Sequence, residues 1–342
     1  MATVTAATPP GLRLEPLAAF LAEPLGLDPA LPLEAELIEG GRSNITCLLR
    51  QGERSWVLRR PPLGHRQPTA HSMRREHDVL AGLAGSEVPA PRPLALCEDE
   101  AVIGAEFYVM ERVEGRILRA PADVDLSPAE ARACGLALIE TLAAQHRADY
   151  ERLGLGGLGR PAGFAARQVK RWTGQLESGI RVTPAMRELG RRLEAAVPAR
   201  EEAALVHGDY RIDNVVLDPA DPGRVAAVLD WEMATLGDPL ADLGMLLMYW
   251  RRPGERCASE VHAITQAEGF PERGELIDAY AAATGFDLDG LEFFLALAHF
   301  KLAVIVAGIR ARMEAGETVG GGFEQIAEIP EALVAEGLEV EL

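Results

Sequence analysis

The chain has 342 residues, 48% of them hydrophobic and 25% charged, which excludes a disordered or fibrous protein and leaves room for two lobes or one large domain. A formal net charge of −18 argues against sequence-independent binding to nucleic acid and against a role at an anionic membrane surface. The four cysteines are far apart and no signal-peptide pattern opens the chain, so we expect a cytoplasmic protein without a disulfide framework or a cysteine metal cluster.

The first third of the chain has the pattern of a small β-rich lobe. A short helix is expected over 13–25, and a second helix over 72–83. Apolar runs bounded by glycine, proline and turn residues predict five strands, over 34–39, 45–51, 55–60, 94–97 and 106–112. We therefore predict an N-terminal helical extension (residues 1–33) and an N-lobe (residues 34–113) made of an antiparallel sheet with one inserted helix.

Helical spacing dominates the rest of the chain, which we assign to a C-lobe of residues 114–342. Helices are expected over 128–149, near 164–178 and 184–197, through most of 240–314, and near 323–336. The apolar segment 293–309 contains His299 and Lys301, which favours a buried core helix over a membrane span. The fold class is thus α+β with two lobes, and a ligand is expected in the cleft between them.

A polar segment of this C-lobe carries a catalytic pattern, framed by two short predicted strands at 203–207 and 225–229. His207 and Asp209 are followed after four residues by Asn214, and the next strand ends at Asp230. This spacing matches the H-x-D-x4-N loop and the metal-binding aspartate of kinases. Asp209 would orient a substrate hydroxyl and accept its proton as the catalytic base, while Asn214 and Asp230 would hold Mg²⁺. The competing interpretation is a polar hairpin whose side chains only satisfy turns.

These motifs carry a family resemblance. The loop from His207 to Asn214, the run Leu229-Asp230-Trp231-Glu232 and the helix start Gly237-Asp238-Pro239-Leu240 resemble the aminoglycoside phosphotransferase and choline kinase superfamily, whose fold is similar to that of protein kinases. The resemblance covers most of the chain and implies a bilobal protein-kinase-like fold. It is especially strong to the branch whose phosphotransferase domains are fused to acyl-CoA dehydrogenases, which implies a hydroxylated acyl compound as the acceptor.

The resemblance also implies a nucleotide site in the N-lobe. Gly40 and Gly41, between the first two strands, would let the backbone approach a phosphate, and Ser43 or Asn44 would donate to it or cap the loop. The segment 107–113 is similar to the hinge between the lobes of a kinase. The backbone of Glu111 and Val113 would meet the adenine edge there, with Met110 beside the ring; ATP is the expected donor and GTP stays open.

The usual phosphate-binding lysine of the third strand is absent. Lysine occurs only at Lys170 and Lys301, just as asparagine occurs only twice, at Asn44 and Asn214. Arg59 takes the lysine position, keeps the positive charge and can grip phosphate through two donors. Its expected partner is Glu76 on the inserted helix, with Asp78 and Glu106 as alternatives. The plain alternative for Arg59 is an ordinary charge on an edge strand.

Three further residues are expected to support the loop. Asp238 would cap the following helix with Pro239 at its first position. The resemblance implies that Asp242 bonds back to the backbone of the catalytic loop. We interpret His207 as a packed histidine that braces this loop.

The acceptor is expected to be a small hydroxylated molecule. Only seven residues separate Asp230 from Asp238, and no A-P-E motif follows, so the segment that binds a peptide in protein kinases is missing. Aminoglycosides, choline, homoserine and macrolides are acceptors in this superfamily. The acidic composition favours a cationic acceptor, in conflict with the hydroxyacyl compound above. A nucleotide-binding pseudokinase remains the alternative, because Arg59 replaces lysine and Trp231-Glu232 replaces the Phe-Gly of the DFG motif. The oligomeric state is left open.

Overall fold

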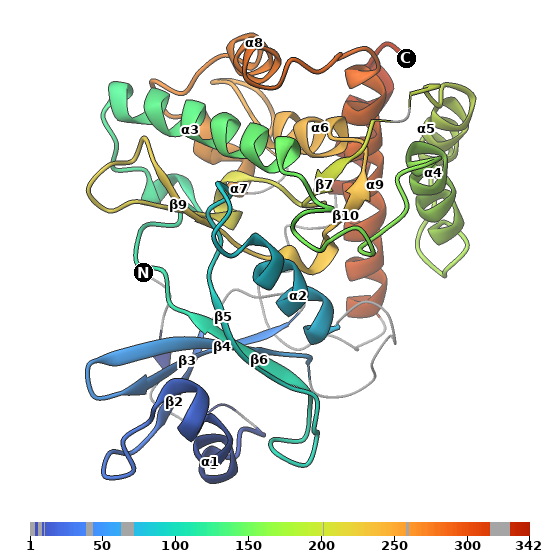
Figure 1. Cartoon of the computed structure of the whole chain (residues 1–342). Coiled ribbons are helices and arrows are strands. Elements are labelled where there is room, and N and C mark those ends of the chain that lie inside the picture. The colour runs from blue at the N-terminus through green and yellow to red at the C-terminus, as the bar shows by residue number, and fades with distance from the viewer. Residues whose placement is uncertain are drawn as a thin grey trace.

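The computed structural model describes residues 4–5, 9, 11–38, 44–62, 72–200, 202–257, 260–314 and 329–342. Within these ranges the chain forms an antiparallel sheet with two helices beside it and a larger, mainly helical part (Figure 1). The expected α+β class with two lobes is confirmed.

The sheet of the N-lobe has the order β1-β2-β3-β4-β6-β5, with antiparallel pairing throughout. Its strands are β1 (Val4–Thr5), β2 (Glu34–Ile38), β3 (Ile45–Gln51), β4 (Arg54–Arg60), β5 (Pro93–Cys97) and β6 (Phe107–Glu111). Five of them follow the predicted runs. β1 was missed, because two residues are too few to show an alternating pattern.

The two faces of this sheet pack against different partners, as the alternation of side chains along a strand requires. Phe107 and Val109 of β6 face α1 (Leu14–Leu25) and form a separate hydrophobic cluster with its buried leucines. Tyr108 and Met110 point to the opposite face and join the main core, together with α2 (Met73–Leu83). In Figure 1 α2 lies between the sheet and the C-lobe. Odd and even positions of the strands therefore separate an outer face from a face that looks toward the C-lobe.

The C-lobe is built from helices and two short two-stranded antiparallel sheets. Its α-helices are α3 (Pro128–Arg147), α4 (Phe164–Gln175), α5 (Pro184–Ala195), α6 (Leu240–Tyr249), α7 (Glu260–Ala263), α8 (Arg273–Thr284), α9 (Leu291–Glu314) and α10 (Ile329–Glu339). One sheet pairs β7 (Ala204–Val206) with β10 (Thr235–Gly237), and the other pairs the consecutive strands β8 (Val215–Leu217) and β9 (Val225–Val228). Single 3-10 turns lie at η1 (Pro121–Asp123), η2 (Ile212–Asn214), η3 (Trp231–Met233) and η4 (Ile264–Gln266).

Several boundaries differ from the sequence-based expectation. α10 extends to Glu339, three residues beyond its expected end, and the expected start near 323 lies outside the described residues. β8 and β10 were missed because three residues carry little periodicity. α6 begins at Leu240, one residue later than a helix with Pro239 at its first position, while Asp238 Oδ1 still accepts from Leu240 N at 3.0 Å.

Helix α9 is the long apolar helix that the sequence predicts for the core. By length and composition it passes the test for a membrane span, and 56% of its most apolar 18-residue window is buried inside the protein. It packs against α6 and α10 (Figure 1), which places it within the C-lobe. Its burial against these helices is that of a core helix.

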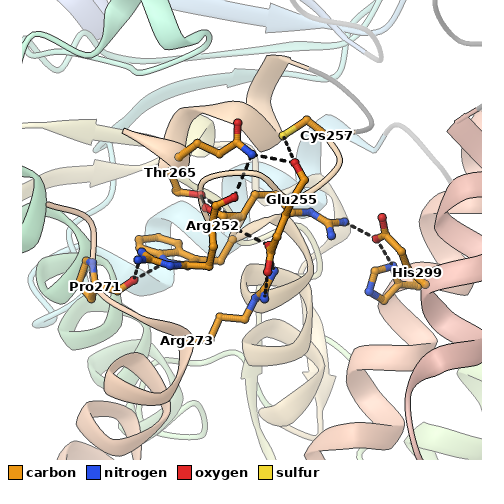
Figure 2. A network of polar contacts seen from close by, with 11 residues as sticks. Arg252, Glu255, Cys257, Thr265, Pro271, Arg273 and His299 are labelled. Carbon is orange, nitrogen blue, oxygen red and sulfur yellow. Dashed lines mark hydrogen bonds and ion pairs between the residues drawn. The ribbon is translucent and has the colours of Figure 1, made fainter. Parts of the chain in front are cut away.

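A network of charged side chains ties the end of α6 to the later helices. Figure 2 shows Glu255 held by Arg273, through two hydrogen bonds of 2.8 and 2.6 Å. Next to it, Arg251 is 6% exposed and donates to Glu336 of α10 at 2.5 Å. His299 also contacts Glu336, but burial lowers the pKa of His299 to about 3, so this ring is neutral at pH 7. Glu336 is therefore the anion that compensates the buried charge of Arg251.

We expect Glu336→Gln to lower the free energy of unfolding by about 2–3 kcal/mol, because it leaves a buried guanidinium without a countercharge. Urea denaturation measures the change. The matched control is Glu188→Gln, which removes one partner of an exposed pair with Arg191 and should cost less than about 1 kcal/mol. Equal losses of unfolding free energy in the two variants would mean that the buried Arg251–Glu336 pair stabilises the protein no more than an exposed pair does.

Candidate active site

The polar segment between β7 and η2 forms a loop whose backbone is fixed by a buried histidine. His207 is fully buried, its Nε2 donates to Leu229 O at 2.8 Å, and its Nδ1 accepts from Asp209 N at 3.2 Å. These two bonds require the tautomer with the proton on Nε2. The ring also packs on Trp231, with 4.8 Å between ring centroids. His207 thus braces the loop, as the sequence predicts.

The loop is also held from α6 by a buried carboxylate. Asp242 accepts from His207 N at 2.6 Å and from Gly208 N at 2.7 Å. Burial acts to raise the pKa of Asp242, but its contacts with His146 and His207 lower it below the ordinary value. Gly208 has φ +86°, and a Cβ there would lie 2.8 Å from Met233 O, so only glycine fits this turn. The ionised carboxylate of Asp242 and the glycine at position 208 together hold the backbone of this loop.

Asp209 and Asn214 lie side by side at the mouth of this loop. Asn214 Nδ2 donates to Asp209 O at 2.9 Å and to Asp209 Oδ2 at 3.2 Å. Arg211 Nε donates to the same Oδ2 at 3.1 Å. Within the described part of the chain nothing donates to Asp209 Oδ1, and the side chain is 26% exposed. This leaves one carboxylate oxygen of Asp209 and the amide oxygen of Asn214 for ligands.

Asp230 lies two residues beyond the end of β9, and not at the end of the strand as expected, in an unusual backbone conformation. Its φ of 67° makes it the single non-glycine residue with positive φ in the described ranges. Such conformations cost energy and cluster at functional sites. Oδ1 accepts from Arg59 Nη2 at 2.9 Å, and the side chain is 33% exposed. The turn directs this carboxylate into the space between the lobes, where Arg59 reaches it.

The donor set of Asn214 and Asp230 fits Mg²⁺ held together with a nucleotide. In the described ranges, the amide oxygen of Asn214 and Oδ2 of Asp230 accept no hydrogen bond, and both are hard oxygen ligands. No group of three histidine, cysteine or carboxylate side chains suited to a metal occurs in those ranges. Mg²⁺ usually takes one or two protein oxygens and completes its shell with phosphates and water. Two protein ligands are therefore enough for the expected role.

Arg59 lies at the centre of a charge cluster that joins the lobes. Its Nη1 is 3.1 Å from Glu76 Oε1, and its side chain is 10% exposed. Glu76, the expected partner, thus pairs with Arg59. Asp78, one of the alternatives, is half exposed and contacts His77 instead. Arg60 points to the other face of β4, where it is fully buried and donates to Gly11 O at 3.2 Å. The strand register places Arg59, and not Arg60, toward the C-lobe.

Glu232 is a member of this cluster that the sequence alone did not single out. Its Oε2 accepts from Asn44 Nδ2 at 2.9 Å and lies 3.9 Å from Arg59 Nη2. Asn44 is 4% exposed, and its amide nitrogen bridges the two lobes through this hydrogen bond. Glu232 stands where protein kinases have the glycine of the DFG motif. This departure from the motif was the signal in the sequence that could have pointed to Glu232. Gly40, Gly41 and Ser43 lie outside the described residues.

A small cavity lies between Arg59 and the end of β6. Its empty volume is about 170 Å³, and it is lined by Arg59, Glu76, Leu80, Pro91, Tyr108, Met110, Leu229, Asp230 and Trp231. Met110, the residue expected beside the base, is one of these lining residues. Glu111 N already donates to Arg92 O at 2.9 Å, so Glu111 has only its carbonyl for a ligand. Val113 follows just beyond the end of β6, half-buried, in the segment that leads into the C-lobe.

Two cations on the other side of Asp209 were also missed by sequence reasoning. Arg211 is fixed by Asp213 at 3.0 Å and lies over the ring of Tyr249, 5.1 Å from its centroid. The ammonium group of Lys301, on α9, donates a hydrogen bond to Gly208 O. The rarity of lysine in this chain was the signal that could have pointed to Lys301. Two cations therefore lie near Asp209, and Arg211 is shared between the carboxylates of Asp209 and Asp213.

Glu76 predicts a pH dependence. Burial raises the pKa of Glu76 to about 7, although Arg59 opposes the shift. Because only the ionised carboxylate pairs with Arg59, we expect kcat/KM for the nucleotide to fall as the pH decreases through about 7. In Glu76→Gln this acidic limb should disappear and the activity at pH 8 should drop to the low-pH level. An unchanged limb near pH 7 in the variant would assign the titration to another group.

Comparisons with known proteins agree with this geometry. A family model described as "Phosphotransferase enzyme family" matches residues 34–294. Acyl-CoA dehydrogenase family member 11 of Gallus gallus is 39% identical over 324 residues, which cover 91% of this chain and 41% of that protein. The chain thus spans about two fifths of the length of this relative.

Solved structures share the whole fold. A Ralstonia eutropha protein described as an aminoglycoside phosphotransferase is 33% identical, with a TM-score of 0.78, over 97% of this chain and 100% of its own. A thermostable mutant of aminoglycoside phosphotransferase APH(4)-Ia, in a ternary complex with AMP-PNP and hygromycin B, is 16% identical, with a TM-score of 0.62 over 95% and 99% of the two chains. At this identity the second match shows the fold alone.

Proposed function

Because this chain belongs to the phosphotransferase enzyme family, we propose that it is a small-molecule kinase that transfers the γ-phosphoryl group of ATP to a substrate hydroxyl. The observation that supports this most directly is that a carboxylate with a free oxygen (Asp209) and an oxygen donor suited to Mg²⁺ (Asn214) lie in one loop. Asn214 O accepts from Leu229 N at 2.8 Å, next to the second oxygen donor, Asp230, and its buried cation, Arg59. Phosphoryl transfer needs this combination of positioning and charge neutralisation.

Each residue then has a defined task. Asn214 and Asp230 would hold Mg²⁺, which neutralises phosphate charge when it is bound with the nucleotide. Arg59 would bind the phosphates while Glu76 keeps its guanidinium in place. Asp209 Oδ1 would accept the hydrogen bond of the acceptor hydroxyl and take its proton during transfer.

The nucleotide itself would lie between the N-lobe sheet and the loop of residues 207–214. Gly40 and Gly41 would bring backbone N–H groups to the phosphates, with Ser43 and Asn44 beside them. Met110, the carbonyl of Glu111 and the backbone of Val113 would contact the base, and GTP stays open as the donor. The four cysteines are unpaired, which supports the cytoplasmic location expected from the sequence.

For the acceptor we favour an anionic hydroxyacyl compound over a cationic aminoglycoside. Arg211 and Lys301 lie near Asp209, and Arg211 is shared with Asp213, so the region holds two cations and two carboxylates. A carboxylate, thioester or phosphate group of the acceptor would gain hydrogen-bond donors from the two cations. The similarity to acyl-CoA dehydrogenase family member 11 supports the same class.

An acceptor panel tests the function. The purified chain is incubated with Mg²⁺ and γ-labelled ATP together with a hydroxyacyl thioester, the free hydroxy acid, choline or an aminoglycoside, and products are identified by mass spectrometry. We expect label in the hydroxyacyl compounds. Transfer to the aminoglycoside alone would overturn the acceptor class. Nucleotide binding without transfer to any hydroxyl would favour the pseudokinase.

The metal assignment predicts a specific defect in Asp230→Asn. Removing this ligand charge should weaken Mg²⁺–AMP-PNP binding by about tenfold or more, and much less in the absence of Mg²⁺. Calorimetric titration with and without Mg²⁺ measures both affinities. Asp209→Ala serves as the comparison, because it lacks a metal role and should change the affinity by less than about twofold. The same Mg²⁺ dependence in Asp230→Asn and wild type would remove Asp230 from the metal site.

A further inference from the structure

Helix α2 is fastened to the C-lobe by the residue next to Glu76. Arg75 Nη2 donates to Leu158 O at 2.7 Å and to Ala234 O, also at 2.7 Å. Leu158 lies in the loop between α3 and α4, and Ala234 follows η3, four residues after Asp230. One guanidinium on the N-lobe helix therefore holds two separate backbone segments of the C-lobe.

A second contact fastens the other end of the same helix. A Cβ at Gly82 would lie 2.8 Å from Leu153 O and 2.8 Å from Leu155 Cδ2, so α2 approaches this loop as closely as a backbone can. The apolar residues of α2 belong to the core shared with the C-lobe, and α1 with the outer face of the sheet forms a different cluster. Figure 1 shows α2 between the two lobes. Helix α2 is thus anchored to the catalytic half of the molecule along its length.

The position of α2 decides where Arg59 lies. Glu76 is 1% exposed and holds Arg59 Nη1, while Asp230 holds Arg59 Nη2. Arg75 bonds to Ala234, on the segment that begins with Asp230. Arg75 and Glu76 are adjacent in sequence, so the distance between the two carboxylates that grip Arg59 depends on the Arg75 contact.

We propose that Arg75 is a positioning residue for phosphoryl transfer, which locks α2 to the segment 230–234 so that Glu76 presents Arg59 to the nucleotide phosphates. The proposal rests on the kinase function proposed above. In protein kinases the activation segment helps to set the inserted helix; here the carbonyls of Leu158 and Ala234 hold it through Arg75. Arg75 acts through Glu76 and need not touch the nucleotide.

The test compares Arg75→Met with Arg74→Ala. Methionine keeps the apolar stem of Arg75 and removes the donors; Arg74 is half exposed and pairs with Glu98 at the surface, so it controls for loss of a charge on α2. Calorimetry gives the affinity for Mg²⁺–AMP-PNP, and thermal denaturation gives Tm. We expect Arg75→Met to bind about tenfold more weakly than wild type and Arg74→Ala to stay within about twofold.

A double-mutant cycle separates positioning from a merely structural role. If Arg75 acts through Glu76, Arg75→Met should change the affinity by less than about twofold in a Glu76→Gln background. A full tenfold loss in that background, or a lowered Tm with unchanged affinity in the single variant, would overturn the proposal. Wild-type affinity in Arg75→Met would do the same. Failure of the wild-type protein to bind Mg²⁺–AMP-PNP at all would instead overturn the proposed function, and this proposal with it.

Discussion

Asp209→Asn should lower kcat for phosphoryl transfer by about 10²–10⁴-fold, the contribution typical of a general base. Asparagine keeps the size of the side chain and its contacts within the loop, so the bonds from His207 and Asp242 to the backbone should survive. What is lost is the basic carboxylate that accepts the hydroxyl proton. Affinity for Mg²⁺–AMP-PNP should change by less than about twofold, because Asn214 and Asp230 are the proposed metal ligands.

The matched control for this variant is Asp213→Asn. Asp213 lies in the same loop and also pairs with Arg211, at 3.0 Å, but we assign it no proton transfer. Its loss should affect the acceptor KM more than kcat, since it loosens Arg211. The measurement is product formation under saturating ATP for both variants. Transfer at the wild-type rate in Asp209→Asn would remove Asp209 from the mechanism.

The residues whose proximity the sequence predicted are those joined by short spacing. Asp209 and Asn214 belong to one loop, and their separation by four residues already determines that both lie at its mouth. Arg59 and Glu76 required one more step, the strand register, which follows from the alternation of side chains along β4. In these cases local geometry carries the information.

The residues that sequence reasoning missed are joined across long separations. The bond from Asn44 to Glu232 spans 188 residues, and the bond from Arg75 to Ala234 spans 159. Neither pair has a spacing pattern, because tertiary packing alone brings the partners together. Lys301 reaches Gly208 over 93 residues in the same way. Such contacts decide how the two lobes are held, and they become visible only when both lobes are in place.

Net charge was also a weak guide to the acceptor. The value of −18 describes the whole surface, whereas an acceptor meets the few side chains around Asp209. Around Asp209 the structure places Arg211 and Lys301 together with a second carboxylate, Asp213. An acceptor would meet this local set of donors and carboxylates, and not the total charge of the chain.

Arg59→Ala should lower kcat/KM for ATP by about 10²–10³-fold, a few kcal/mol, because the triphosphate charge would meet Glu76, Asp230 and Glu232 without a cation between them. Arg59→Lys should retain part of the activity, since the charge remains while the two-donor geometry is lost.

Arg60→Ala tests the register of β4 in the same assay. Arg60 is fully buried on the opposite face, so its loss should lower Tm but leave kcat/KM for ATP within about threefold when it is assayed well below the transition. Activity and Tm are therefore measured together for Arg59→Ala, Arg59→Lys and Arg60→Ala. A crippled Arg60→Ala beside an active Arg59→Ala would transfer the phosphate-binding role to Arg60, and equal activity of all three with wild type would remove this strand from nucleotide binding.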